Sequence, residues 1–82
     1  MTIKEILTKW YREAFKGKFH LLGPIYYHID NNTLLIFTNW PGILIGLHGQ
    51  TIDKYIKVLK ENNFNYEIKF VELSKYVGVY EI

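Results

Sequence analysis

The residues with the clearest capacity for binding chemistry are Gly46-Leu47-His48-Gly49, two glycines that bracket two other residues. Glycine has no Cβ atom, so the backbone of a ligand can approach closely at such positions. Apolar runs that suit helices flank these residues, and a helix that begins after Gly49 would present N–H groups that attract phosphate. The pattern therefore fits a phosphate contact, although many helix–helix turns contain glycine for structural reasons alone.

Other chemical functions have little support in the sequence. His20, His28 and His48 lack the i, i+4 spacing of a helical metal-binding pair, and no carboxylate cluster accompanies them. Ser74 is the only serine, and it does not occur in a nucleophile-elbow motif. The Lys-Ser/Thr pair of a P-loop does not follow Gly49. We therefore expect a non-enzymatic protein with no catalytic residue, no metal, no cofactor and no small-molecule substrate.

The elements around the glycines are expected to be two helices. Pro41 suits the first turn of a short helix, where the missing N–H costs nothing. Gly46 can end that helix in a left-handed conformation, and Gly49 lets the next helix begin almost at once. From Thr51 onward, apolar residues recur at i, i+3, i+4 and i+7, on one face of an amphipathic helix: Ile52, Tyr55, Ile56 and Leu59.

Residues 44–52 read Leu-Ile-Gly-Leu-His-Gly-Gln-Thr-Ile, which resembles the signature of K-homology (KH) domains: an aliphatic pair, GxxG, and an aliphatic residue three positions later. Residues 33–73 are similar to the type II KH domain of the small-subunit ribosomal protein that carries one. The resemblance implies the order α-β-β-α-α-β, with a three-stranded mixed sheet and the helices packed on one face. It also implies a groove for single-stranded RNA, or less favourably DNA, in which the GxxG loop clamps about four nucleotides.

The resemblance also implies which residues contact the nucleic acid. Family members usually carry Lys or Arg within GxxG, whereas Leu47-His48 gives this loop little charge near neutral pH. Lys54 and Lys57 match basic positions of the ribosomal relative and are candidate phosphate contacts. Trp40 could stack on a base, or it could cover the edge of the core instead. The candidate nucleic-acid-binding residues are Trp40, Ile43, Ile45, Gly46, Leu47, His48, Gly49, Gln50, Lys54 and Lys57.

The rest of the chain predicts elements in the same order. Residues 2–16 read as an amphipathic helix, with a capping box formed by Thr2 and Glu5 and a stop at Gly17. Strands are expected over residues 25–30, 33–38 and 66–71. Asn31-Asn32 can supply the positive φ values of a two-residue hairpin turn. The second and third strands should be parallel, because two helices connect them.

Alternation along the second strand separates its side chains into two sets. Leu34, Ile36 and Thr38 would face the helices, whereas Leu35 and Phe37 would lie on the open face of the sheet. The expected core is one cluster that contains Ile6, Trp10, Leu34, Ile36, Ile52, Ile56, Leu59, Ile68 and Phe70.

Composition limits the class of protein. A chain of 82 residues suits a single KH-like domain over residues 1–82, with residues 74–82 as an aromatic C-terminal extension. Disorder is disfavoured because 49% of the residues are hydrophobic. With a net charge of +2, nucleic-acid binding would depend on a local patch. There is no cysteine, no apolar run of membrane-spanning length and no signal-peptide pattern, so we expect a cytoplasmic protein without membrane contact.

A second function stays open at this stage. The same scaffold could have lost nucleic-acid binding and could serve as a protein–protein interaction module. Its contact surface would then contain Leu35, Phe37 and residues 74–82, and an exposed apolar patch of a few hundred Å² would be its sign. The fold cannot decide between the two functions, because function resides in the site rather than in the scaffold.

Overall fold

Helix α1 spans Ile3–Ala14, within the residues 2–16 that the sequence predicts as helical. Its capping box is confirmed. The Thr2 hydroxyl accepts a hydrogen bond from the Glu5 N–H at 3.2 Å, and the Glu5 carboxylate accepts one from the Thr2 N–H at 2.9 Å. Gly17 has a φ of +80° in the turn after the helix. The apolar stripe of this amphipathic helix contains five buried residues, namely Ile6, Leu7, Trp10, Tyr11 and Phe15, and two half-buried ones, Ile3 and Ala14.

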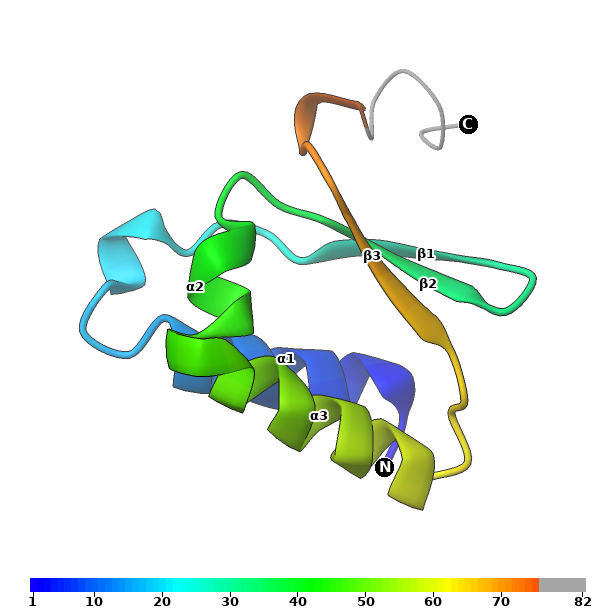
Figure 1. The fold of residues 1–82 in the computed structure, drawn as a ribbon. Helices are drawn as coiled ribbons and strands as arrows, with labels where there is room; N and C mark the ends of the chain where they lie inside the picture. The colour runs from blue at the N-terminus through cyan, green and yellow to red at the C-terminus, as the bar shows by residue number, and fades with distance from the viewer. Residues whose placement is uncertain (76–82) are drawn as a thin grey trace. The chain divides into compact units, whose positions relative to one another are not determined.

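The other helices are α2 (Pro41–Ile45), α3 (Gln50–Glu61) and the short 3-10 helices η1 (Phe19–Leu21) and η2 (Leu47–Gly49). Together with α1 they belong to one compact unit, made of residues 1–23 and 40–65 (Figure 1). The computed structural model describes residues 1–75. Within that part of the chain, no helix has the length and apolar character needed to cross a membrane.

Helices α1 and α3 lie side by side and run in opposite directions (Figure 1). At one end, the N-terminal ammonium of Met1 donates a hydrogen bond to Oδ1 of Asn62 at 3.1 Å. At the other end, Glu13 of α1 forms an ion pair with Lys54 of α3. The C-terminal end of α1 therefore lies beside the first turns of α3.

Trp10 connects α1 to the α-helices α2 and α3 of the same unit. Its buried indole Nε1 donates a hydrogen bond of 2.9 Å to the Leu44 carbonyl of α2. Its ring stacks on Tyr55 of α3, with 5.6 Å between the ring centroids and 4° between the planes. Because α2 and α3 are the two helices that flank the glycine loop, these contacts fix both ends of the loop.

The three strands form the second compact unit, which contains residues 24–39 and the segment that begins at Tyr66. Strand β1 (Tyr26–Asp30) pairs with β2 (Thr33–Phe37) in antiparallel orientation, and β2 pairs with β3 (Glu67–Val71) in parallel orientation, as predicted. The chain is thus a small α+β domain with a three-stranded mixed sheet.

The two-residue turn between β1 and β2 is confirmed, because Asp30 pairs with Thr33 across Asn31-Asn32. The expectation of positive φ at both residues is wrong for Asn32. Asn31 has a φ of +55°, whereas Asn32 does not have a positive φ. A positive φ at the first central position alone is the φ pattern of a type II′ turn, another turn that suits a hairpin.

The expectation that Leu35 and Phe37 lie on an open sheet face is corrected by the structure. Leu35 is 8% exposed and Phe37 is 1% exposed. One physical reason for this burial is that β2 lies at the centre of the sheet and has a strand on each side. Phe37 pairs with Tyr26 of β1 and with Val71 of β3, so large neighbours flank it on the same face.

The predicted core residues divide into two groups. The first group is buried, namely Ile6, Trp10, Leu34, Ile36 and Leu59. The second group is half-buried, namely Ile52, Ile56, Ile68 and Phe70. Ile68 and Phe70 belong to the edge strand β3, and the buried stripe of α3 is centred on Tyr55 and Leu59 instead. The expected aromatic C-terminal extension comprises residues 74–82, of which residues 76–82 lie outside the described residues.

Candidate nucleic-acid interface

The glycine loop consists of two overlapping tight turns between α2 and α3. The Gly49 N–H donates a hydrogen bond to the Gly46 carbonyl at 3.1 Å, and the Gln50 N–H donates one to the Leu47 carbonyl. His48 and Gly49 have φ values of +55° and +73°, which are the positive values of a type I′ turn. His48 is among the residue types that enter the left-handed region more often than most.

Gly46 ends α2, as the sequence predicts, but in a conformation other than the expected left-handed helical one. Its φ is +79° and its ψ is 173°, a region that is essentially restricted to glycine. A Cβ atom at this position would also lie 2.8 Å from the Cβ of Thr51 in α3. Glycine at position 46 is therefore required both by the backbone conformation and by the close approach of α3.

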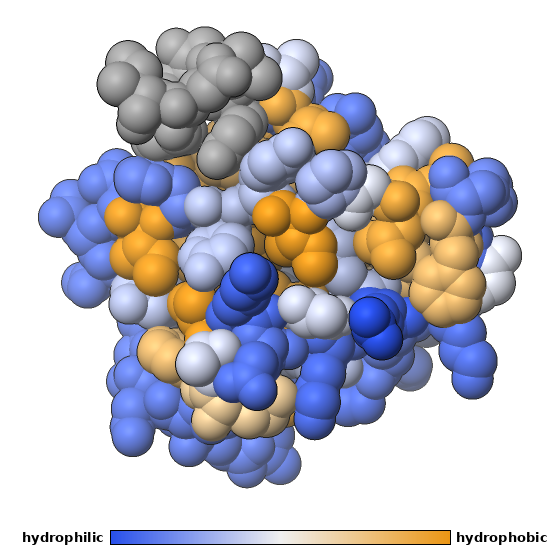
Figure 2. Space-filling view, turned by 180° about the vertical axis from the view of Figure 1, so that it is seen from behind, coloured by the Kyte–Doolittle hydropathy of each residue, from blue (hydrophilic) through white to orange (hydrophobic). Residues whose placement is uncertain are grey.

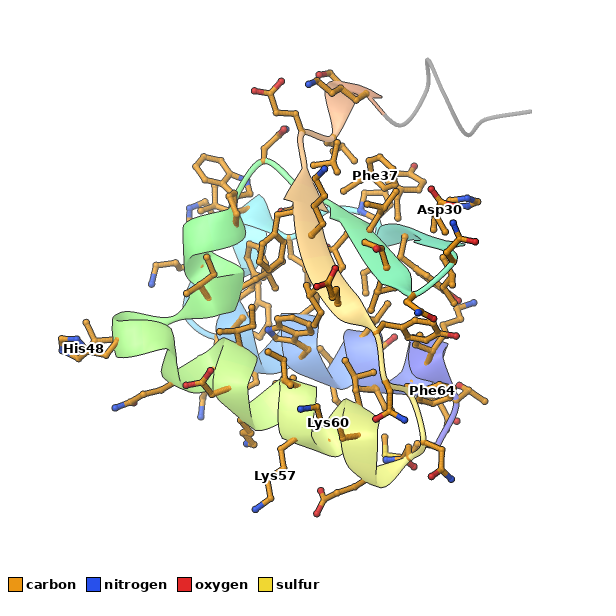
Figure 3. All side chains as sticks on the ribbon, turned by 45° about the vertical axis from the view of Figure 1, so that its right-hand side comes forward. Asp30, Phe37, His48, Lys57, Lys60 and Phe64 are labelled. Atoms are coloured by element: carbon orange, nitrogen blue, oxygen red, sulfur yellow. The ribbon has the colours of Figure 1, made fainter. Side chains whose placement is uncertain are left out.

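The middle of the loop is open to solvent. Leu47 is 75% exposed, more than any other large hydrophobic residue in the described part of the chain. His48 is also exposed, and its side chain points away from the helices (Figure 3). Within the described residues, the N–H groups of Leu47 and His48 have no backbone partner outside their own turn. The loop tip thus exposes two side chains, and its two amide N–H groups are not used in backbone hydrogen bonds outside the turn within the described residues.

The start of α3 fits the phosphate prediction in part. No side chain caps this end of the helix, because Gly49 occupies the N-cap position. The N–H of Gln50, however, already donates to the Leu47 carbonyl. The backbone N–H of Gln50 is therefore not available to a phosphate, and Gln50 could contact one only through its exposed side chain.

Lys54 is not a free cation. Its Nζ lies 2.5 Å from Oε1 of Glu13, and the Tyr55 hydroxyl donates to the same oxygen at 3.1 Å. The hydrogen bond from Lys54 holds the pKa of Glu13 below its usual value of 4.5, and the bond to Glu13 raises the pKa of Lys54. Both groups are therefore charged near neutral pH, and a phosphate would have to compete with Glu13 for Lys54.

Lys57 is exposed on α3 and points away from the helix (Figure 3). No ion pair of Lys57 is found within residues 1–75. Trp40 is 44% exposed at the N-cap of α2, the opposite end of this helix from the glycine loop. Ile43 and Ile45 are half-buried on α2 between these two points. The structure thus brings the predicted residues into one unit, with Lys57 as an available cation.

The structure adds residues that the sequence did not indicate. An open pocket of about 450 Å³ adjoins the loop and is lined by Glu13, Ala14, Lys18, Gly42, Ile43, Gly46, Leu47 and Thr51. Glu13 and Lys18 come from the end of α1 and the turn after it, about 30 residues before the loop in sequence. The helical pattern predicted an exposed Glu13, whereas Lys18 follows the predicted helix. The position of both residues beside the loop depends on the pairing of α1 with α3.

Neither a metal site within residues 1–75 nor an extended apolar patch on the face drawn in Figure 2 is found. No group of three or more His, Asp or Glu residues within residues 1–75 could hold a metal ion. On the face that Figure 2 draws, hydrophobic residues form several small patches that hydrophilic residues separate. Comparison with protein-family models, curated proteins and solved structures gave no match to this chain.

Proposed function

We propose that this chain is a KH-like domain of type II that binds single-stranded nucleic acid, RNA in preference to DNA, through its glycine loop. The observation that carries the proposal is the loop tip. Leu47 and His48 are exposed between two glycines with positive φ, and their N–H groups have no backbone partner outside the turn among the described residues. Such a turn lets a sugar–phosphate strand lie close to the backbone.

Three further features support the proposal. The helices and strands follow the order α-β-β-α-α-β, and β2 and β3 are parallel. In a type II domain the helices would pack on one face of the sheet, which completes the groove. The start of α3 has no side-chain cap, and a helix N-terminus favours anions. Lys57 adds an exposed cation on the same helix.

The low charge of the loop determines how binding should behave. Leu47 and His48 add no permanent cation, and Lys54 is paired with Glu13. Few phosphates would be neutralised, so affinity should be modest and should depend only weakly on salt. The rest of the binding free energy would come from apolar contact of Leu47 and stacking of Trp40 with bases, because every base has an apolar face.

The test is a titration of short fluorescein-labelled oligouridine and oligodeoxythymidine with wild type and with Leu47→Asp/His48→Asp. Both positions are exposed, and Asp tolerates the left-handed conformation of residue 48, so the fold should persist. Two added carboxylates should weaken binding by at least about tenfold, because like charges repel the phosphates. The matched control is Asn63→Asp/Asn65→Asp, which adds the same charge at exposed positions beyond α3.

Two results would contradict the proposal. One is equal binding by wild type and the loop variant, and the other is no binding by wild type at high micromolar protein. The exposure of Leu47 then favours the second function, a protein–protein contact made by an apolar loop tip. Leu35 and Phe37 would not contribute to that contact, because both are buried.

A further inference from the structure

The pocket beside the glycine loop contains charged groups of both signs. Glu13 and Lys18 line it together with Gly46, Leu47 and Thr51. Lys54 of α3 is not part of this lining, but its Nζ contacts the Glu13 carboxylate and so lies next to the pocket. Lys54 also follows Thr51 by three residues, so the two side chains lie on the same side of α3. Glu13 thus lines the pocket together with Lys18 and is at the same time the ion-pair partner of Lys54.

We propose that this pocket is a second subsite for backbone phosphate, in which Lys18 and Lys54 supply the positive charge. In the free protein, Lys54 is held in its ion pair with Glu13. The inference rests on the proposed function, because the phosphate would belong to the strand that the glycine loop holds. It adds two residues, Glu13 and Lys18, that the loop signature does not contain.

The strengths of the competing contacts favour such an exchange. Lys54 and Glu13 keep 56% and 41% of their side-chain surface exposed, and exposed ion pairs contribute little to stability. A phosphate offers several charged oxygens to both lysines at once, which makes stronger hydrogen bonds. Within residues 1–75, no ion pair of Lys18 is found, so its ammonium can meet the phosphate first.

Glu13 remains supported when Lys54 leaves it. The Tyr55 hydroxyl donates to the Glu13 carboxylate at 3.1 Å, and the buried Tyr55 ring is fixed by its stacking on Trp10. The carboxylate therefore stays beside the pocket and continues to repel the strand. Glu13 accordingly limits both the affinity of the site and the number of cations that it offers.

The experiment compares wild type, Glu13→Gln, Lys54→Gln, the Glu13→Gln/Lys54→Gln double variant and Lys18→Gln, with oligouridine as the probe. Gln keeps an oxygen that accepts from the Tyr55 hydroxyl while it removes the charge. At low salt, Glu13→Gln should bind several-fold more tightly than wild type, and its logarithmic salt slope should steepen by about 0.7 for one additional phosphate contact. Lys18→Gln should bind more weakly, and its slope should decrease by about 0.7.

The controls separate this mechanism from a general effect of charge. Glu61→Gln removes the same charge at the exposed far end of α3 and should change binding much less. In the Lys54→Gln background, Glu13→Gln should lose the part of its effect that comes from the release of Lys54 and should keep only the part that comes from the removed repulsion, so its effect should be smaller than in wild type. Thermal unfolding verifies that each variant is folded, and Lys18→Gln tests the subsite without removing any side-chain hydrogen bond or ion pair found within residues 1–75.

Several outcomes would overturn the inference. They are a Glu13→Gln effect no larger than that of Glu61→Gln, an equal effect in the Lys54→Gln background, or an unchanged affinity of Lys18→Gln. If wild type binds and the Leu47→Asp/His48→Asp variant does not, these results reject the second subsite and leave the proposed function intact. If wild type does not bind the probe, both are rejected.

Discussion

Gly46 and Thr51 approach so closely that a Cβ atom at position 46 would lie 2.8 Å from the Cβ of Thr51. Gly49 differs, because the atoms nearest to its Cβ position lie at 4.0 Å. Gly49→Ala should therefore cost about 1–2 kcal/mol from its left-handed backbone alone. Gly46→Ala should cost more, because about 1–3 kcal/mol of backbone strain adds to the overlap with Thr51. Urea unfolding of the two variants tests the order, and equal losses would contradict it.

The two tryptophans provide a second comparison. Trp10→Phe removes the Nε1 donor and leaves the buried Leu44 carbonyl without it, which should cost about 1–3 kcal/mol in addition to the lost volume. The same change at Trp40, which is 44% exposed, should cost less than about 1 kcal/mol. Thermal unfolding measures both. A loss of stability at Trp40 as large as that at Trp10 would mean that Trp40 covers the core rather than contacting a ligand.

Features that depend on neighbouring residues in the chain were predictable from the sequence. Thr2 and Glu5 form the capping box because both partners lie within one turn of helix. Pro41 occupies the first turn of α2, and Gly46 ends that helix. The hairpin and the parallel pairing of β2 with β3 followed from turn length and from the helical connection.

Features that depend on packing were not predictable in the same way. The burial of Leu35 and Phe37 depends on their neighbours in a three-stranded sheet, whereas the sequence shows only alternation. The pairing of Lys54 with Glu13 requires α1 and α3 to run in opposite directions at a particular register. Such contacts join residues about 40 positions apart, and periodicity within one helix contains no information about them.

The buried position of Phe37 leads to a third prediction. Phe37→Ala should cost about 3–5 kcal/mol, because it removes a large side chain that is 1% exposed. Leu47→Ala is the contrasting control, and at 75% exposure it should change stability by less than about 0.5 kcal/mol. Urea unfolding measures both changes. A Phe37→Ala variant as stable as wild type would restore Phe37 as a candidate contact residue.

A fourth prediction concerns the response to acid. The N–H of Thr2 donates to Glu5 and lowers the pKa of this carboxyl below its usual 4.5, and the hydrogen bond from Lys54 does the same for Glu13. The folded chain therefore holds fewer protons than the unfolded chain at pH values between the lowered and the usual pKa values, so stability rises with pH in that range. The contribution of both groups is fully present above pH 4.5 and is lost as the pH falls through their folded pKa values.

The measurement is the midpoint of thermal unfolding from neutral pH down to about pH 3. Wild type should lose stability below pH 4.5, and Glu13→Gln should lose less of it because one of the two carboxyls no longer titrates. The Glu5→Gln/Glu13→Gln variant should have the flattest profile, whereas Glu61→Gln, at the exposed end of α3, removes neither contact and should follow wild type. If all four proteins lost stability in parallel, the acid response would arise elsewhere in the chain, and the Glu13–Lys54 pair would not persist in solution.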